Sequence, residues 1–159
     1  GGLMRTFVGV WLEACDSLRS VHQRKLCSLA LCVLLTSADP AVAVANLEPI
    51  IVVATGALAE LDGGAASGSG GVLGQQWQRG CDGDDEDEDA GEGGAQRLRA
   101  AHAADQAAQA DLRAALRDAL RAAEATHGAA FAQAMGGVHA HVRTQLERAL
   151  QPPADSAAQ

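Results

Sequence analysis

Apolar residues between positions 3 and 35 recur with the period of an α-helix. One apolar side chain falls on the same helical face at steps of four, four and three residues: Leu3, Phe7, Trp11 and Ala14. This spacing predicts a helix over about residues 3–15. Residues 16–20 interrupt the pattern, and a second stripe then predicts a helix over about residues 21–35: Leu26, Leu29, Ala30, Val33 and Leu34. Two helices joined by a few residues form an antiparallel hairpin.

Start signals for further helices follow the hairpin. Asp39 can accept a hydrogen bond as an N-cap and Pro40 suits the first helical position, so a short helical turn is expected after them. Because Pro49 would break a helix that had already formed, we place the start of the main helix just before it, with Asn46 as its cap. That helix is expected over about residues 47–61, with one apolar face: Leu47, Ile50, Ile51, Ala54, Leu58 and Leu61.

Residues 63–96 have a different composition. A Gly/Ser-rich stretch leads into a block of like charges, which cannot bury enough apolar surface to offset chain entropy, so we expect a disordered insertion. Its densest acidic run is Asp84, Asp85, Glu86, Asp87, Glu88 and Asp89. This run could contact a basic partner or act only as a solubilising spacer. Its spacing does not match a calcium-binding loop, which needs a central glycine and a glutamate at the twelfth position.

Residues 97–151 return to a helical pattern rich in alanine. A narrow stripe of Leu112, Leu116 and Ala119 or Leu120 lies beside an arginine row made by Arg113, Arg117 and Arg121. The row indicates either a solvated face with intrahelical pairs to Asp118 and Glu124 or a contact for an acidic partner. Gly128 is expected to end this helix in left-handed backbone. A last amphipathic helix is predicted from one stripe that continues through Gly136 and Gly137: Phe131, Met135, Val138, Val142, Leu146 and Leu150.

No segment alternates apolar and polar residues, so the sequence predicts an all-α fold. We interpret the chain as a fragment of a HEAT-type helical-repeat superhelix. One helical pair cannot cover its own apolar stripe, and neighbouring repeats must stack on it. The expected regions are HEAT-type helices at 1–62, a disordered acidic insertion at 63–96, C-terminal helices that cap the solenoid at 97–151 and a disordered tail at 152–159.

Composition limits the core and the partners. Aromatic residues make up 3% of the chain, so the core must come from Leu, Val and Ile with anchors such as Phe7, Trp11 and Phe131. The net charge of −8 belongs to the acidic insertion, and no cluster of Lys and Arg suited to nucleic acid is present. The cysteines contain no CxxC pair and are expected to be reduced core thiols: Cys15, Cys27, Cys32 and Cys81.

The sequence offers no constellation for catalysis, a cofactor or a metal. His139 and His141 would point away from each other on a helix, and the pairs His102 with Asp105 and His127 with Glu124 supply two ligands each. Zinc takes three or four protein ligands, so all five histidines are expected at the surface. The glycine runs follow no strand and match no phosphate-binding motif. We therefore expect a binding scaffold and no enzyme.

A membrane-associated hairpin over residues 26–61 is the weaker alternative to a helical scaffold. The longest apolar run, 26–35, is about half of what a membrane span requires. Asn46 and Glu48 would also lie at hydrocarbon depth, which costs a few kcal/mol. We therefore expect no membrane insertion.

The segment from Trp11 to Pro40 resembles the last HEAT-type repeats of the importin-β (karyopherin-β) family of nuclear transport receptors. The matching positions are Trp11-Leu12, Asp16, and Arg24-Lys25-Leu26-Cys27 followed by Leu29-Ala30-Leu31. The form HQRKLC is similar to importins seven and eight. The run SLALCVLLTSADPAV and the closing segment GAAFAQAMGGVHAHVRTQLERAL are more similar to importin eleven.

This resemblance implies a Ran-regulated import receptor that shuttles between nucleus and cytoplasm. Such a solenoid carries protein cargo past the nucleoporins, and GTP-bound Ran releases the cargo by binding the amino-terminal arch. That arch is not in this sequence, so no Ran contact falls on its residues. The chain would supply curvature, part of the cargo surface and a terminal cap. A non-shuttling HEAT-like scaffold or regulatory subunit would have the same helices and is the alternative.

Overall fold

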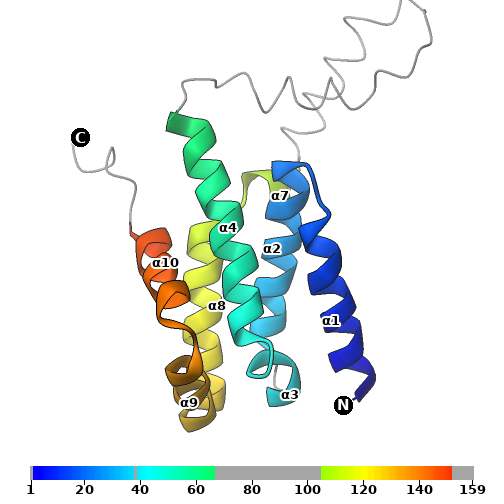
Figure 1. Ribbon diagram of the computed structural model, residues 1–159, viewed down its shortest axis with the longest axis vertical. Helices are drawn as coiled ribbons and strands as arrows, with labels where there is room; N and C mark the ends of the chain where they lie inside the picture. Colours follow the sequence, from blue (N-terminus) through cyan, green and yellow to red (C-terminus); the bar gives the residue numbers. More distant parts are fainter. Residues whose placement is uncertain (1, 38, 67–104, 152–159) are drawn as a thin grey trace, which may run out of the picture.

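The computed structural model describes residues 2–37, 39–66 and 105–151 (Figure 1). All regular elements within these ranges are helices, which confirms the all-α class. Their bounds are α1 (Gly2–Asp16), α2 (Val21–Leu35), α3 (Pro40–Ala43), α4 (Leu47–Ala66), α7 (Gln106–Gln109), α8 (Leu112–His127), α9 (Ala129–Gly137) and α10 (Ala140–Leu150).

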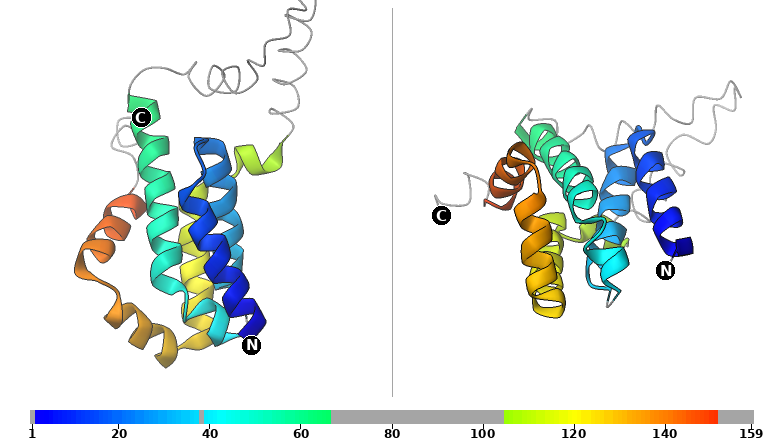
Figure 2. Two further views of the ribbon diagram at one scale, coloured as in Figure 1. Left: turned by 45° about the vertical axis from the view of Figure 1, so that its right-hand side comes forward. Right: turned by 60° about the horizontal axis from the view of Figure 1, so that its bottom comes forward.

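The long helices alternate in direction, with α2 and α4 in the middle of the bundle (Figure 1). α2 packs against α4 and α8, while α10 packs against α4. α1 and the α9–α10 pair lie at opposite edges of the bundle (Figures 1 and 2). Helices that precede residues 67–104 in the sequence therefore pack directly against helices that follow them.

One apolar core joins the helices before and after residues 67–104. Its largest fully buried members come from α2, α4, α8 and α10: Leu31, Leu35, Leu47, Ile50, Ile51, Leu112, Leu116 and Val142. Phe131 is 8% exposed and joins this core, as its assignment as an anchor predicted. The expected stripe of α4 is also buried, apart from Leu61, which is partly buried. The expected stripe of α2 is wrong: Val33 is 67% exposed, and the neighbouring face with Leu31, Cys32 and Leu35 is buried instead. These helices therefore stabilise one another mainly by removing apolar surface from water.

The cap expected at Asp39 is confirmed, whereas Asn46 makes a different bond from the expected one. The Asp39 carboxylate accepts from the Ala41 N–H at 2.9 Å, and Pro40 occupies the first position of α3. α4 begins at Leu47, so Pro49 falls in its first turn, where its missing N–H costs no helical hydrogen bond. Asn46 donates from its side chain to the Val42 carbonyl oxygen, a bond to the preceding turn that the sequence did not predict. α4 extends to Ala66, past the expected end at residue 61.

The prediction of one continuous closing helix is wrong. α9 ends at Gly137, and Val138 takes up an extended conformation with ψ 134° before α10 begins at Ala140. Gly136 and Gly137 weaken the helix at this point, because glycine has the largest backbone entropy to lose. The break changes the direction of the chain, so that Phe131 on α9 and Val142 and Leu146 on α10 all reach the core.

The core-facing side of α1 also differs from the expected one. Val8 and Cys15 are buried, whereas Leu3 is 86%, Phe7 56% and Val10 61% exposed. Phe7 is therefore not a core anchor, and its ring lies against the half-buried Trp11, whose indole N–H donates to the Cys27 sulfur at 3.1 Å. α1 carries apolar residues on more than one face, and packing on α3 and α4 selects a different one. We call the remaining set the α1 outer face: Leu3, Phe7, Val10 and Ala14.

None of the described helices is both long enough and apolar enough to cross a membrane.

Two glycines should respond in opposite ways to replacement by alanine. Gly56 lies in the interior of α4 with open space around the added Cβ atom, so Gly56→Ala should raise the free energy of unfolding by about 0.5–1 kcal/mol. Gly128 has open space too, but its φ of +49° disfavours a side chain, so Gly128→Ala should lower the free energy of unfolding by about 1 kcal/mol. Urea titration measures both values, and a shift of the same sign in both variants would contradict this assignment.

The expected core thiols are confirmed for Cys15, Cys27 and Cys32, which are buried and not joined by disulfides; Cys81 lies outside the described residues. Burial raises the pKa of the Cys32 thiol from 9.0 to about 11. The folded state then holds this proton more tightly than the unfolded state, so stability is lost as pH rises from about 9 to 11. The unfolding free energy of the native chain should therefore fall more steeply over this window than that of Cys32→Ala. Parallel slopes in the two proteins would show that the thiol does not contribute.

Candidate functional site

The acidic run predicted as a contact for basic partners lies outside the described residues. Asp84 to Asp89 fall within residues 67–104, so the structure places none of their side chains. The two interpretations, partner contact and solubilising spacer, both remain predictions. A candidate site must therefore be built from the histidines, the arginine row and the apolar surfaces of the described helices.

His139 and His141 lie at the surface, as predicted, and three of the described histidines contact residues far away in the sequence. His127 Nε2 lies 2.9 Å from the Ser37 carbonyl oxygen, and His139 Nδ1 lies 2.5 Å from Glu48 Oε1. Both contacts connect the C-terminal helices with the segment from α2 to α4. His22 is 8% exposed, so its expected surface position is wrong. Its Nε2 faces Asp105 across 3.8 Å, because α7 packs beside α2.

His139 and His141 do not point in opposite directions as predicted. Their ring centroids are 5.7 Å apart, because His139 precedes α10 in extended backbone and does not follow helical geometry. Even so, no group of three or more His, Cys, Asp or Glu side chains in residues 2–37, 39–66 and 105–151 is placed to hold a metal ion.

Arg113 does not lie on a solvated face as the arginine row suggested. Its guanidinium donates to both carboxylate oxygens of Asp62 at 2.8 and 3.0 Å, and its Nε donates to the Ala149 carbonyl oxygen at 2.6 Å. The side chain is only 13% exposed. Arg113 thus connects the first turn of α8 with α4 and with the end of α10. The unpaired carbonyl groups and the helix dipole at the end of α10 favour a positive charge there.

Arg117 is partly buried, as Arg113 is, whereas Arg121 is exposed. Arg117 donates from Nη2 to the Leu150 carbonyl oxygen at 3.2 Å, so it also binds the end of α10. The Arg121 side chain is 73% exposed and has Asp118 at 3.8 Å, the pair expected for a solvated face. Of the predicted arginine row, Arg113 and Arg117 therefore hydrogen-bond to the end of α10, and Arg121 faces the solvent.

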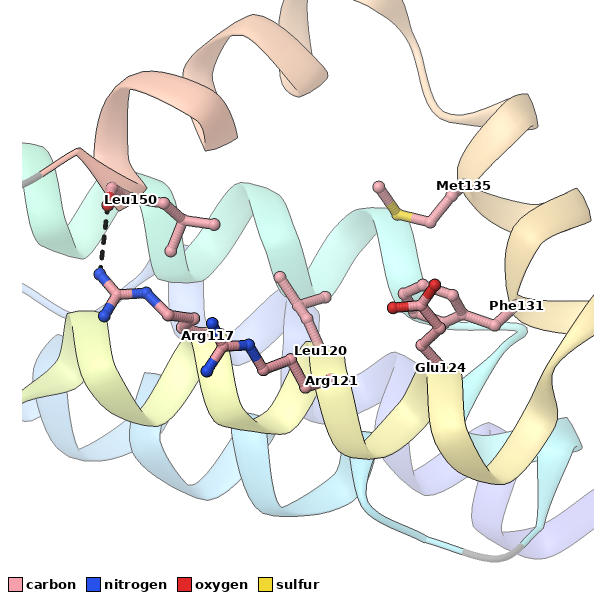
Figure 3. Close-up of a pocket in the computed structure, with 7 residues that line it drawn as sticks. All are labelled: Arg117, Leu120, Arg121, Glu124, Phe131, Met135 and Leu150. Atoms are coloured by element: carbon pink, nitrogen blue, oxygen red, sulfur yellow. Dashed lines mark hydrogen bonds between the residues drawn. The ribbon is translucent and has the colours of Figure 1, made fainter.

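An apolar pocket opens between α8 and the α9–α10 pair, with a volume of about 260 Å³. Figure 3 shows Leu120 of α8 facing Met135 of α9, with Leu150 at one end and Phe131 at the other. The polar residues of its lining all come from α8: Arg117, Arg121 and Glu124. The two arginines lie toward Leu150, whereas Glu124 lies beside Phe131 (Figure 3). The pocket is apolar inside, with opposite charges at its two ends.

The sequence did not predict this pocket. Phe131 and Met135 were placed on one continuous stripe with Leu150, which would have left no hollow between them. The usable signal was the Gly136-Gly137 pair, because two adjacent glycines inside an amphipathic pattern favour a break. The break separates Met135 from Leu150 and lets both border the hollow over Leu120.

Antiparallel helices that pack side by side, with an apolar outer face left on α1, are the arrangement expected for a fragment of a helical-repeat protein. A family model described as importin-11-like, TPR repeats, matches residues 1–151. The chain belongs to the importin-11-like family. The predicted resemblance to the importin-β family and the helical-repeat class are both confirmed. The comparison with curated proteins gave no match, and the comparison with solved structures gave none either.

Arg113 should be more important for stability than any exposed arginine of these helices. Arg113→Lys keeps the charge but loses the forked geometry, so we expect a loss of about 1–3 kcal/mol in the free energy of unfolding. Arg143→Lys, at an exposed position of α10, is the matched control and should change this value by less than about 0.5 kcal/mol. Urea unfolding compares the two, and equal values would show that the Asp62 and Ala149 contacts contribute little.

Proposed function

We propose that this chain is the C-terminal part of a nuclear import receptor that carries protein cargo through the nuclear pore under the control of Ran GTPase. The observation that supports this most is the family match over residues 1–151, because it covers both helical segments and the residues between them. Membership of an importin family indicates a transport receptor that acts by binding. We infer that catalysis has no part in its role.

The α1 outer face supports placing the chain at the end of a longer solenoid. Leu3, Phe7 and Val10 are each more than half exposed on one side of one helix. A helical repeat presents such a face to the repeat before it, because neighbouring units share one continuous core. We propose that an upstream helix covers this face in the full-length receptor. The α9–α10 pair, at the opposite edge, would then form the terminal cap.

The transport role is tested with the full-length protein that contains this chain. Beads carrying Ran locked with GTP should retain the protein, and beads carrying Ran with GDP should not. Immobilised nucleoporin repeats should retain it as well. A protein that binds neither Ran-GTP nor nucleoporin repeats would be a non-shuttling scaffold, and the proposal would fail. The coding sequence upstream of Gly1 gives a second test, since it should encode further helical repeats.

Covering the α1 outer face should slow hydrogen exchange in α1. The quantity to compare is the exchange rate of α1 amides divided by that of α4 amides. We expect this ratio to be lower in the full-length receptor than in the chain alone, because α1 gains a packing partner only in the full-length receptor. Phe7→Asp in the full-length protein should restore fast exchange in α1. Val33→Asp, at a position of α2 that is 67% exposed, is the matched control and should leave the ratio unchanged. An unchanged ratio in the full-length receptor would show that nothing covers α1.

A further inference from the structure

The pocket between α8 and the α9–α10 pair is an unfilled apolar surface in a well-packed part of the molecule. Leu120, Met135 and Leu150 are each only partly buried, although all three pack against the core. Their sides that face the hollow lack the dispersion contacts that the rest of the core has. An apolar group that entered would gain those contacts and remove apolar surface from water.

The size of the pocket favours side chains over a small organic ligand. Sites for drug-sized molecules have volumes of roughly 300–1,000 Å³. The pocket at about 260 Å³ falls below that range and has no polar groups that converge at its base. One or two apolar side chains of a peptide fit this volume and this lining.

The charges at the two ends of the pocket give a peptide its orientation. Arg117 uses one of its N–H groups on Leu150, and Arg121 has its nearest carboxylate at 3.8 Å, so both keep donors for a second partner. Asp118 follows Arg117 by one position, which turns it about 100° away on the helix, past Arg121 and away from the pocket. Glu124 lies at the Phe131 end and repels a second acid there (Figure 3).

We propose that this pocket docks a peptide segment of a partner protein that has one or two large apolar side chains preceded or followed, on one side only, by Asp or Glu. The apolar side chains occupy the space bordered by Leu120, Met135 and Phe131. The carboxylates lie at the Leu150 end and pair with Arg117 and Arg121. The inference goes beyond the transport role and does not depend on it.

The methionines make the test direct, because the chain contains two, Met4 and Met135. The chain is labelled at its methionine methyl groups and titrated with a short synthetic peptide that has a central Leu-Phe pair and Asp and Glu on one side. The Met135 methyl resonance should shift and saturate, while that of Met4 on α1 should stay in place. A peptide with alanines in place of Leu-Phe should cause no shift. The absence of a Met135 shift, or an equal shift at Met4, would overturn the proposal.

Charge reversal tests the arginine end separately. Replacing Asp and Glu of the peptide by Lys should weaken binding by about fivefold, as expected for partly exposed ion pairs. Arg121→Glu should reverse that preference, so that it binds the Lys peptide more tightly. Arg143→Glu, an exposed arginine of α10 outside the pocket, should keep the native preference. Thermal unfolding checks that both variants are folded. Equal binding of the two peptides by the native chain would rule out the proposed charge recognition.

Discussion

The packing of α2 between α4 and α8 is the constraint on which the rest of the structure depends. α2 and α4 precede residues 67–104, and α8 follows them, so this contact brings together two parts of the chain that are distant in sequence. Leu31 and Leu35 of α2 meet Leu112 and Leu116 of α8 in one fully buried cluster. Without that cluster, neither segment could cover its apolar stripe. The positions of Arg113 and of the pocket both follow from where α8 is held.

Helix positions could be predicted from the sequence wherever a period of three to four residues coincided with a cap or a proline. The starts of α3 and α4 are examples, because Asp39 caps α3 and Pro49 lies in the first turn of α4. The buried face of α1 could not be predicted in this way. Two of its faces carry apolar residues, and only the positions of α3 and α4 decide that Val8 is buried and Phe7 is exposed.

The candidate site was less accessible to sequence reasoning than the helices were. The spacing of Arg113, Arg117 and Arg121 shows that they share a face, but not that α10 ends beside that face. Arg24 is a similar case: it lies off the apolar stripe of α2, yet it donates to the Leu18 carbonyl oxygen and pairs with Glu60 of α4. Long cationic side chains reach partners on other helices. The spacing of residues along one helix does not show which residues of the other helices lie nearby. The pocket depends on such tertiary placement throughout.

The end of α4 and the start of α7 lie at the same end of the bundle (Figure 1). The chain therefore leaves and re-enters the helical bundle at the same end, and most of the intervening sequence belongs to the insertion predicted to be disordered at residues 63–96. For a flexible loop the entropy of closure depends on the logarithm of its length, so a doubling costs only about 0.6 kcal/mol. A disordered insertion of the kind predicted at residues 63–96 would therefore accept changes of length at little cost to folding, and its length and charge could diverge during evolution while the helical bundle stays the same.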